Sequence, residues 1–160
     1  MSVANLLIYS TTHIASSFYD DKTKAGLFPK NWISLNEKPD PNFTFAALFS
    51  QLSQFLTSTV MLAQSGLDSS AKVILRSAIE LSSQISILLF FREDLKKYVE
   101  AGTDDEMRNV WFKIFAKKKI PNKLKDINYW FYEDKRIAEV LVDERSEMSS
   151  FLSSTTHSDT

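Results

Sequence analysis

The feature of this sequence that most restricts its fold is a stretch without any charged residue, which runs from Asn42 to Leu67. Its apolar side chains recur every three or four residues, as they do on one face of a helix: Phe45, Leu48, Phe49, Leu52, Phe55, Leu56, Val60 and Leu62. Serine, threonine and glutamine interrupt the stretch, whereas a membrane span needs about 20 predominantly apolar residues. The pattern therefore predicts a helix over residues 42–65, buried in a core or covered by a second subunit, that ends at Gly66.

Helical spacing also dominates the rest of the chain. A capping box, in which Thr103 is followed three residues later by Glu106, marks the start of one helix. The chain has only three glycines and four prolines, which argues against a turn-rich β-sandwich. We therefore expect an all-α fold, a five- or six-helix bundle with a long central helix and no β-sheet. The other expected helices cover residues 3–20, 69–100, 103–120, 121–132 and 133–156.

The chain of 160 residues has the length of one domain. We expect residues 1–160 to form a single helical domain, with a helix and a packed loop in residues 1–41 and the bundle core in residues 42–160. No positively charged segment precedes the apolar residues of Met1–Tyr9, so no signal peptide is predicted. We expect a cytoplasmic protein that does not enter a membrane.

The composition argues against several kinds of chemistry. Nineteen basic and 20 acidic residues give a net charge of −1, which provides no overall attraction to nucleic acid. The absence of cysteine removes disulfides, thiol nucleophiles and thiolate metal sites. The two histidines, His13 and His157, are far apart in sequence, and no Glu-x-x-His motif or glycine-rich phosphate loop occurs. We expect no metal and no cofactor.

Arg76 and Glu80 are the only charged residues between Val73 and Phe91, and their spacing of four places them on one helix face. Ser83 and Gln84 extend this face into a narrow polar stripe. One interpretation is structural: the stripe faces solvent, or the ion pair fixes the helix register. The other is a pocket in which Arg76 holds an anionic ligand, such as a phosphate, as a small-molecule sensor would.

A second candidate site is the segment of residues 108–125, which is basic, lacks acidic residues and contains interleaved aromatic residues. Such segments bind single-stranded nucleic acid through phosphate contacts and stacking. The alternative is a solvated basic face, since positive charge is favoured at a helix C-terminus. The candidate nucleic-acid-binding residues are Phe112, Lys113, Lys117, Lys118 and Lys119.

Residues 75–80 (Leu-Arg-Ser-Ala-Ile-Glu) resemble the L-R-S-x-x-E helix of a bacterial family of uncharacterised all-helical proteins. Members carry a later Ser-x-x-x-His motif, which matches Ser153 to His157 here, and the resemblance covers residues 42–160. That family is distantly similar to HEPN domains, which include dimeric, metal-independent RNases of toxin and phage-defence systems. The resemblance implies that Arg76, Glu80 and His157 are catalytic and that RNA is a partner.

The chain departs from the HEPN nuclease pattern in one respect. That pattern places an arginine four to six residues before the histidine, whereas the nearest arginine upstream of His157 is Arg145. Arg76, from another helix, would have to take this role. Members of the resembling family usually continue with a further helix after the histidine, so the resemblance also implies that this chain is C-terminally truncated.

Besides the small-molecule sensor, two functions stay open on these grounds. The first is a self-associating or partner-binding module without catalysis. We expect it to be a dimer with the uncharged helix near the interface, because the apolar surface of the chain exceeds what a five-helix monomer needs. The second is a HEPN-like RNase or RNA-binding protein, in which Arg76 neutralises phosphate and His157 acts as general acid or base.

Overall fold

The computed structural model describes residues 3–17, 41–116, 119–132 and 134–154, and within these ranges it contains seven α-helices and no β-strand. The predicted all-α class is confirmed. The helices are α1 (Val3–Ser17), α3 (Pro41–Gln64), α4 (Asp68–Phe90), α5 (Arg92–Glu100), α6 (Asp104–Phe115), α7 (Lys119–Phe131) and α8 (Lys135–Ser154).

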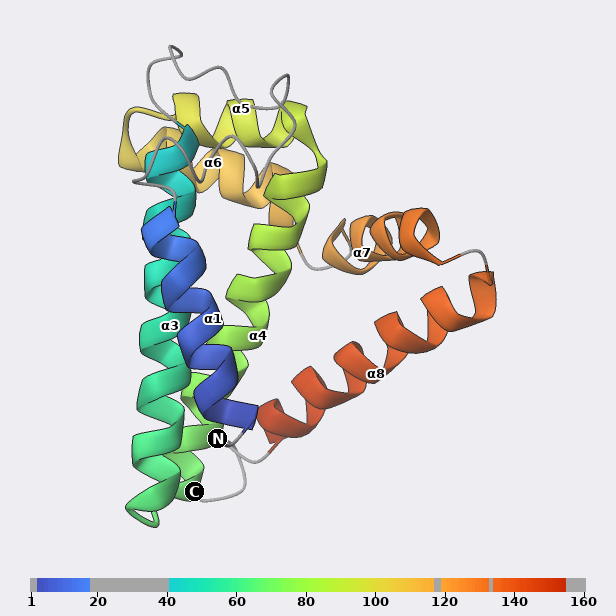
Figure 1. Cartoon of the computed structure of the whole chain (residues 1–160). Helices are drawn as coiled ribbons and strands as arrows, with labels where there is room; N and C mark the ends of the chain where they lie inside the picture. Colours follow the sequence, from blue (N-terminus) through green and yellow to red (C-terminus); the bar gives the residue numbers. More distant parts are fainter. Residues whose placement is uncertain (1–2, 18–40, 117–118, 133, 155–160) are drawn as a thin grey trace.

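Three long helices, α1, α3 and α4, lie side by side and make the most extensive contacts of the fold (Figure 1). The turn between α3 and α4 is closed at Gly66, which has a φ of 75°. Its amide donates to the carbonyl of Ala63, and the amide of Leu67 donates to that of Leu62. This is a Schellman motif, in which a glycine takes the left-handed conformation that a Cβ atom disfavours. The predicted end of the uncharged helix at Gly66 is therefore confirmed.

The predicted long helix over residues 69–100 is instead two helices. Phe91 has extended backbone angles (φ −105°, ψ 90°), so α4 ends at Phe90 and α5 begins at Arg92. The carbonyl of Phe91 accepts from the amides of Asp94 and Leu95, which starts the new helix. The redirected α5 brings Asp94 to Lys123 of α7, where the two side chains form an ion pair. Together with α6, α5 lies across one end of the three long helices (Figure 1).

The boundary between α6 and α7 also differs from the prediction. The capping box is confirmed, because the Thr103 hydroxyl accepts from the Glu106 amide and the Glu106 carboxylate accepts from the Thr103 amide. However, α6 ends at Phe115 rather than near Ile120. Pro121 lies in the first turn of α7, where amide groups have no partner within the helix and proline is therefore tolerated.

The core lies where α3, α4, α5, α6 and α7 meet. Its most deeply buried large side chains come from three of the five helices, α3, α4 and α6: Phe45, Ile87, Leu88, Ile114 and Phe115. By contrast, α8 buries only Ala138 and Leu152 among its described side chains. With α7 it forms a pair that extends away from the three long helices and returns to α4 near the end of α8 (Figure 1). The packed loop expected within residues 1–41 lies outside the described residues.

Two of the described helices, α3 and α4, are long and apolar enough to cross a membrane by length and composition alone. This is weak evidence for a membrane location, because core helices of soluble proteins meet the same criterion. Hydroxyl groups of Thr57 and Thr59 donate to carbonyls of their own helix, which satisfies them without water. The hydroxyls of Thr12 on α1 and Ser53 on α3 share a 2.6 Å hydrogen bond.

Candidate functional site

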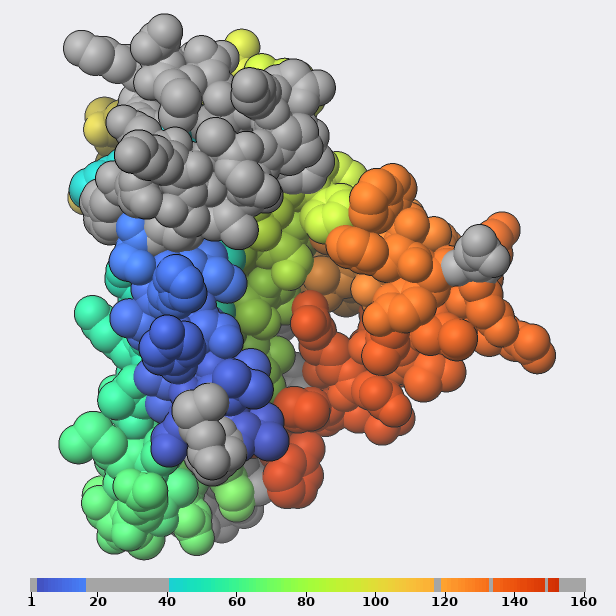
Figure 2. Space-filling view, in the orientation of Figure 1, coloured from blue at the N-terminus to red at the C-terminus, as the bar shows by residue number. Residues whose placement is uncertain are grey.

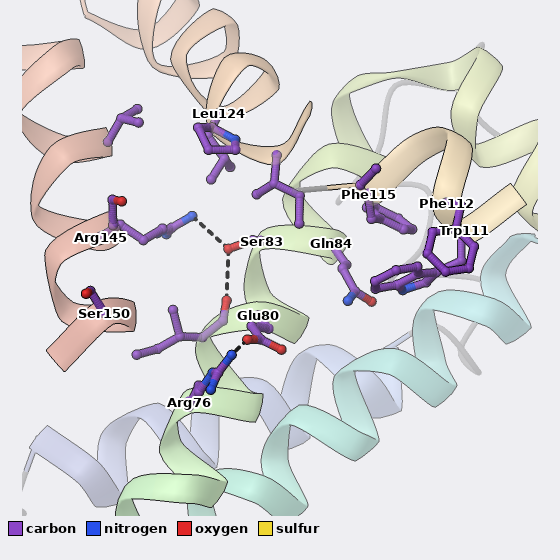
Figure 3. Close-up of a pocket in the computed structure, with 16 residues that line it drawn as sticks. Arg76, Glu80, Ser83, Gln84, Trp111, Phe112, Phe115, Leu124, Arg145 and Ser150 are labelled. Atoms are coloured by element: carbon purple, nitrogen blue, oxygen red, sulfur yellow. Dashed lines mark hydrogen bonds and ion pairs between the residues drawn. The ribbon is translucent and has the colours of Figure 1, made fainter. Parts of the chain in front are cut away.

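A cleft of about 1100 Å³ separates α4 from α7 and α8, with α6 at one end. Figure 2 shows an opening between α4 and the α7–α8 pair, and Figure 3 shows the side chains around the cleft. We name it the α4–α8 cleft. Its lining consists of Arg76, Ile79, Glu80, Ser83 and Gln84 from α4; Trp111, Phe112, Phe115 and Ala116 from α6 and its end; Ile120, Pro121 and Leu124 from α7; and Val142, Arg145, Ser146 and Ser150 from α8.

Arg76 and Glu80 form the ion pair that their spacing predicts. The Nε of Arg76 donates to Oε1 of Glu80 across 3.0 Å, and the two side chains are 40% and 48% exposed. An ion pair this exposed contributes little to stability. The polar stripe predicted from these residues with Ser83 and Gln84 lines the α4–α8 cleft (Figure 3). The stripe therefore supplies the polar side chains of one cleft wall.

On the opposite wall, α8 supplies a second arginine. The Nη1 of Arg145 donates to the hydroxyl of Ser83 across 3.4 Å, and that hydroxyl donates to the carbonyl of Ile79 across 2.9 Å (Figure 3). Burial lowers the pKa of the half-buried Arg145 guanidinium below its ordinary value. An arginine nevertheless keeps its proton near neutral pH. Within the described part of the chain, no carboxylate forms an ion pair with Arg145.

The charges that line the cleft do not cancel. Among the described residues that line it, Arg76, Glu80 and Arg145 are charged, so their formal sum is one positive charge. Because Arg76 is matched by Glu80, the excess lies at Arg145. The cleft therefore combines a partly desolvated guanidinium with a neutral ion pair on the facing helix.

Aromatic side chains of α6 close one end of the cleft. The rings of Trp111 and Phe112 meet edge to face, with centroids 5.3 Å apart, and Phe115 lies beside Trp111 at 6.4 Å. The spacing of apolar residues in α6 predicts an apolar stripe that includes Trp111 and Phe115 but not Phe112. Phe115 is 1% exposed, as this predicts, whereas Trp111 is 39% exposed. Phe112 is 52% exposed, in agreement with a position away from the apolar stripe. The exposure of Trp111 has a physical cause, since this part of α6 faces the cleft rather than another helix.

The other predicted site residues are only partly placed by the structure. Lys113 is exposed, and its carbonyl accepts a 2.5 Å hydrogen bond from Nζ of Lys119. Neither lysine lines the cleft. Lys117, Lys118 and His157 lie outside the described residues. The structure thus brings Arg76 and Glu80 together and does not place the third member of the expected catalytic set. The described residues include no group of three or more metal-ligating side chains.

The prediction from sequence missed Arg145 as a cleft residue. On α8 it follows Ala138 and Val142 at helical spacing and precedes Leu152 by seven residues, so it shares their inward face. A charged residue within an otherwise apolar helix face is the signal that would have identified it.

Comparison of the chain with models of protein families, with curated proteins and with solved structures finds no match. The resemblance that residues 75–80 suggest therefore stays a prediction, and the function is argued from the geometry alone.

Proposed function

We propose that this chain is a self-associating helical module without catalysis of its own, and that it pairs with a second copy through the outer face of α8. The observation that carries this proposal is an exposed apolar stripe along that helix. Its members are between 36% and 59% exposed: Ile137, Val140, Leu141, Met148 and Phe151.

These side chains lie on one side of the helix, where the exposed Glu144 separates Ile137, Val140 and Leu141 from Met148 and Phe151. With about 3.6 residues per turn, all five lie within a sector of roughly 100° of the α8 circumference. The adjacent sector carries Ala138, Val142 and Leu152, which face the protein's own core and cleft. A helix with apolar residues on two adjacent sectors, of which one is solvent-exposed, is expected to bury the second against a partner.

The charges along α8 favour another copy of this helix as that partner. Its first turn carries the exposed Lys135 and Arg136, whereas Asp143, Glu144 and Glu147 occupy its middle. Antiparallel pairing of two copies, centred near Val140, places the basic first turn of each helix toward the acidic middle of the other. Such pairing has the two-fold symmetry that is commonest among homodimers. Opposite charges at the rim then fix orientation and register.

The proposed interface differs from the one that the sequence pattern suggests. The uncharged helix α3 already packs against α1 and α4, which use much of its apolar surface. The exposed side of α8 has less cover among the described helices: α8 contacts mainly α7 and α4, and Nζ of Lys72 on α4 lies 5.9 Å from the centre of the Phe151 ring. We therefore place the interface on α8 rather than on α3.

Sedimentation velocity over a range of concentrations tests the proposal. We expect the wild-type mass to rise from 18.3 kDa toward twice that value. Val140→Lys places a charge in the apolar stripe and is expected to keep the chain monomeric. Met61→Lys makes the same kind of change on the exposed surface of α3 and serves as the matched control, which should dimerise like wild type. A wild-type chain that stays monomeric at high concentration contradicts the proposal, as does dissociation by Met61→Lys alone.

The absence of catalysis is tested separately. Wild-type protein, Arg76→Ala and His157→Ala are incubated with labelled single-stranded RNA in EDTA. The proposal predicts no cleavage by any of them. Cleavage by wild type that both substitutions abolish would establish the metal-independent RNase instead.

The proposal also includes a cytoplasmic location with α3 and α4 inside the folded domain. It is supported by the Arg76–Glu80 pair within α4 and by the Thr12–Ser53 hydrogen bond that ties α3 to α1. On cell fractionation we expect the chain in the supernatant without detergent. Recovery only in the membrane fraction would contradict this part of the proposal.

A further inference from the structure

Beyond self-association, we infer that the α4–α8 cleft binds a small organic acid whose oxyanion headgroup contacts Arg145 and whose flat ring lies against Trp111 and Phe112.

The headgroup is assigned from the state of Arg145. A guanidinium has five N–H donors, and the hydrogen bond to Ser83 uses one nitrogen of Arg145 at the long distance of 3.4 Å. A half-buried cation without an anionic partner is costly, because part of its hydration is lost without compensation. A carboxylate or phosphate in the cleft supplies that partner and accepts two parallel N–H bonds from the planar group. The hydroxyls of Ser146 and Ser150, also on the α8 wall, can donate to the same oxyanion.

The facing wall restricts which acids fit. Glu80 neutralises Arg76 and presents a carboxylate to the cleft, so Arg145 leaves one excess positive charge among the described lining residues. In a polyanion, one negative group would pair with Arg145, and the Glu80 carboxylate would repel the others. The charge balance therefore favours a ligand with a single acidic group, and Glu80 can accept a hydrogen bond from a hydroxyl or amine of that ligand.

The ring is assigned from the aromatic end of the cleft. Trp111 and Phe112 expose parts of their rings to the cleft, and Leu124 and Ile120 add apolar surface from α7. Aromatic ligands pack edge to face or offset against such rings. The cleft volume of about 1100 Å³ is slightly above the range of about 300–1,000 Å³ usual for small-molecule sites, so space does not restrict an acid of nucleotide size.

Isothermal titration calorimetry with two acids and their neutral analogues tests this inference. Adenosine monophosphate and indoleacetate both combine a flat ring with an acidic group, which is a phosphate in the first and a carboxylate in the second. Adenosine and indole lack the acidic group, and inorganic phosphate lacks the ring. We expect at least one acid to bind about tenfold or more tightly than its neutral analogue and than phosphate. Binding of the first acid identifies a phosphate headgroup, and binding of the second a carboxylate. No binding of either acid at millimolar concentration overturns the inference.

Substitutions then separate the cleft from the rest of the surface. Arg145→Gln is expected to weaken binding of the acid about tenfold to a hundredfold, because a charge-assisted hydrogen bond is lost. Arg136→Gln removes an exposed arginine of the same helix and is expected to leave the affinity unchanged. Phe112→Ala tests the ring contact at an exposed position, so its effect does not depend on the folding of an Arg145 variant. Equal affinity of wild type, Arg145→Gln and Phe112→Ala would overturn the inference even if an acid binds.

Discussion

The guanidinium of Arg145 on α8 donates a hydrogen bond to the hydroxyl of Ser83 on α4, across 3.4 Å in space and 62 residues in sequence. It is a direct polar link between two helices that face each other across a cleft (Figure 3). Because α8 buries few of its described side chains, this link and the packing of Leu152 hold its second half near α4. The same two residues therefore position α8 and shape the cleft.

Replacement of Ser83 should weaken this link measurably. Ser83→Ala removes the acceptor of Arg145 and is expected to lower the free energy of unfolding by about 1–2 kcal/mol. Ser82→Ala is the matched control, because the Ser82 hydroxyl also donates to the carbonyl of Ile79 but, among the described residues, forms no hydrogen bond with α8. Urea unfolding followed by circular dichroism gives both values. Equal losses in the two variants would show that the contact with Arg145 contributes nothing.

The helical character of this chain could be predicted because its signals are local. The spacing of apolar residues, the glycine at the end of α3 and the Thr103–Glu106 capping box each involve residues within one or two turns. The same holds for the Arg76–Glu80 pair, whose two members are neighbours on one helix face. Such features depend little on how the helices pack.

What the sequence did not reveal depends on contacts between distant segments. Nothing near Phe91 marks a helix end, since neither glycine nor proline occurs there, and the break is accompanied by an ion pair between Asp94 and Lys123. The assignment of Arg145 to the cleft likewise requires knowing that α8 folds back toward Ser83. These placements are tertiary and cannot be obtained from helical periodicity.

The capping box of α6 provides a second prediction. Thr103→Ala removes the hydroxyl that accepts from the Glu106 amide, so one donor at the helix start loses its partner. We expect a loss of about 0.5–2 kcal/mol in the free energy of unfolding. Thr103→Ser keeps the oxygen and should restore nearly wild-type stability, as read from chemical unfolding. A serine variant as unstable as the alanine variant would indicate that the methyl group, rather than the cap, is responsible.

The ion pair between Asp94 of α5 and Lys123 of α7 should be worth more than the exposed pairs of this protein. The two side chains are only 15% and 21% exposed, and Nζ of Lys123 also lies 5.2 Å from the centre of the Phe91 ring. In a double-mutant cycle with Asp94→Ala and Lys123→Met, we expect a coupling of about 1–3 kcal/mol.

The cycle has a control within the same helix. Lys96 and Glu100 of α5 are 66% and 57% exposed and 4.0 Å apart. Their coupling is expected to stay below about 0.5 kcal/mol. Similar couplings for the two pairs would mean that burial between α5 and α7 does not strengthen the first one.

Tyr98 should make stability depend on pH in the alkaline range. Its ring meets Phe115 edge to face, with centroids 6.1 Å apart, and burial raises the pKa of its phenol above the ordinary 10.0. Below pH 10 the phenol is neutral in both states, so its contribution to stability is fully present. Above that value the unfolded chain loses the proton first, which favours unfolding until the folded phenol ionises as well. The midpoint of urea unfolding should therefore fall more steeply above pH 10 in wild type than in Tyr98→Phe, whereas parallel declines would show that this phenol does not contribute.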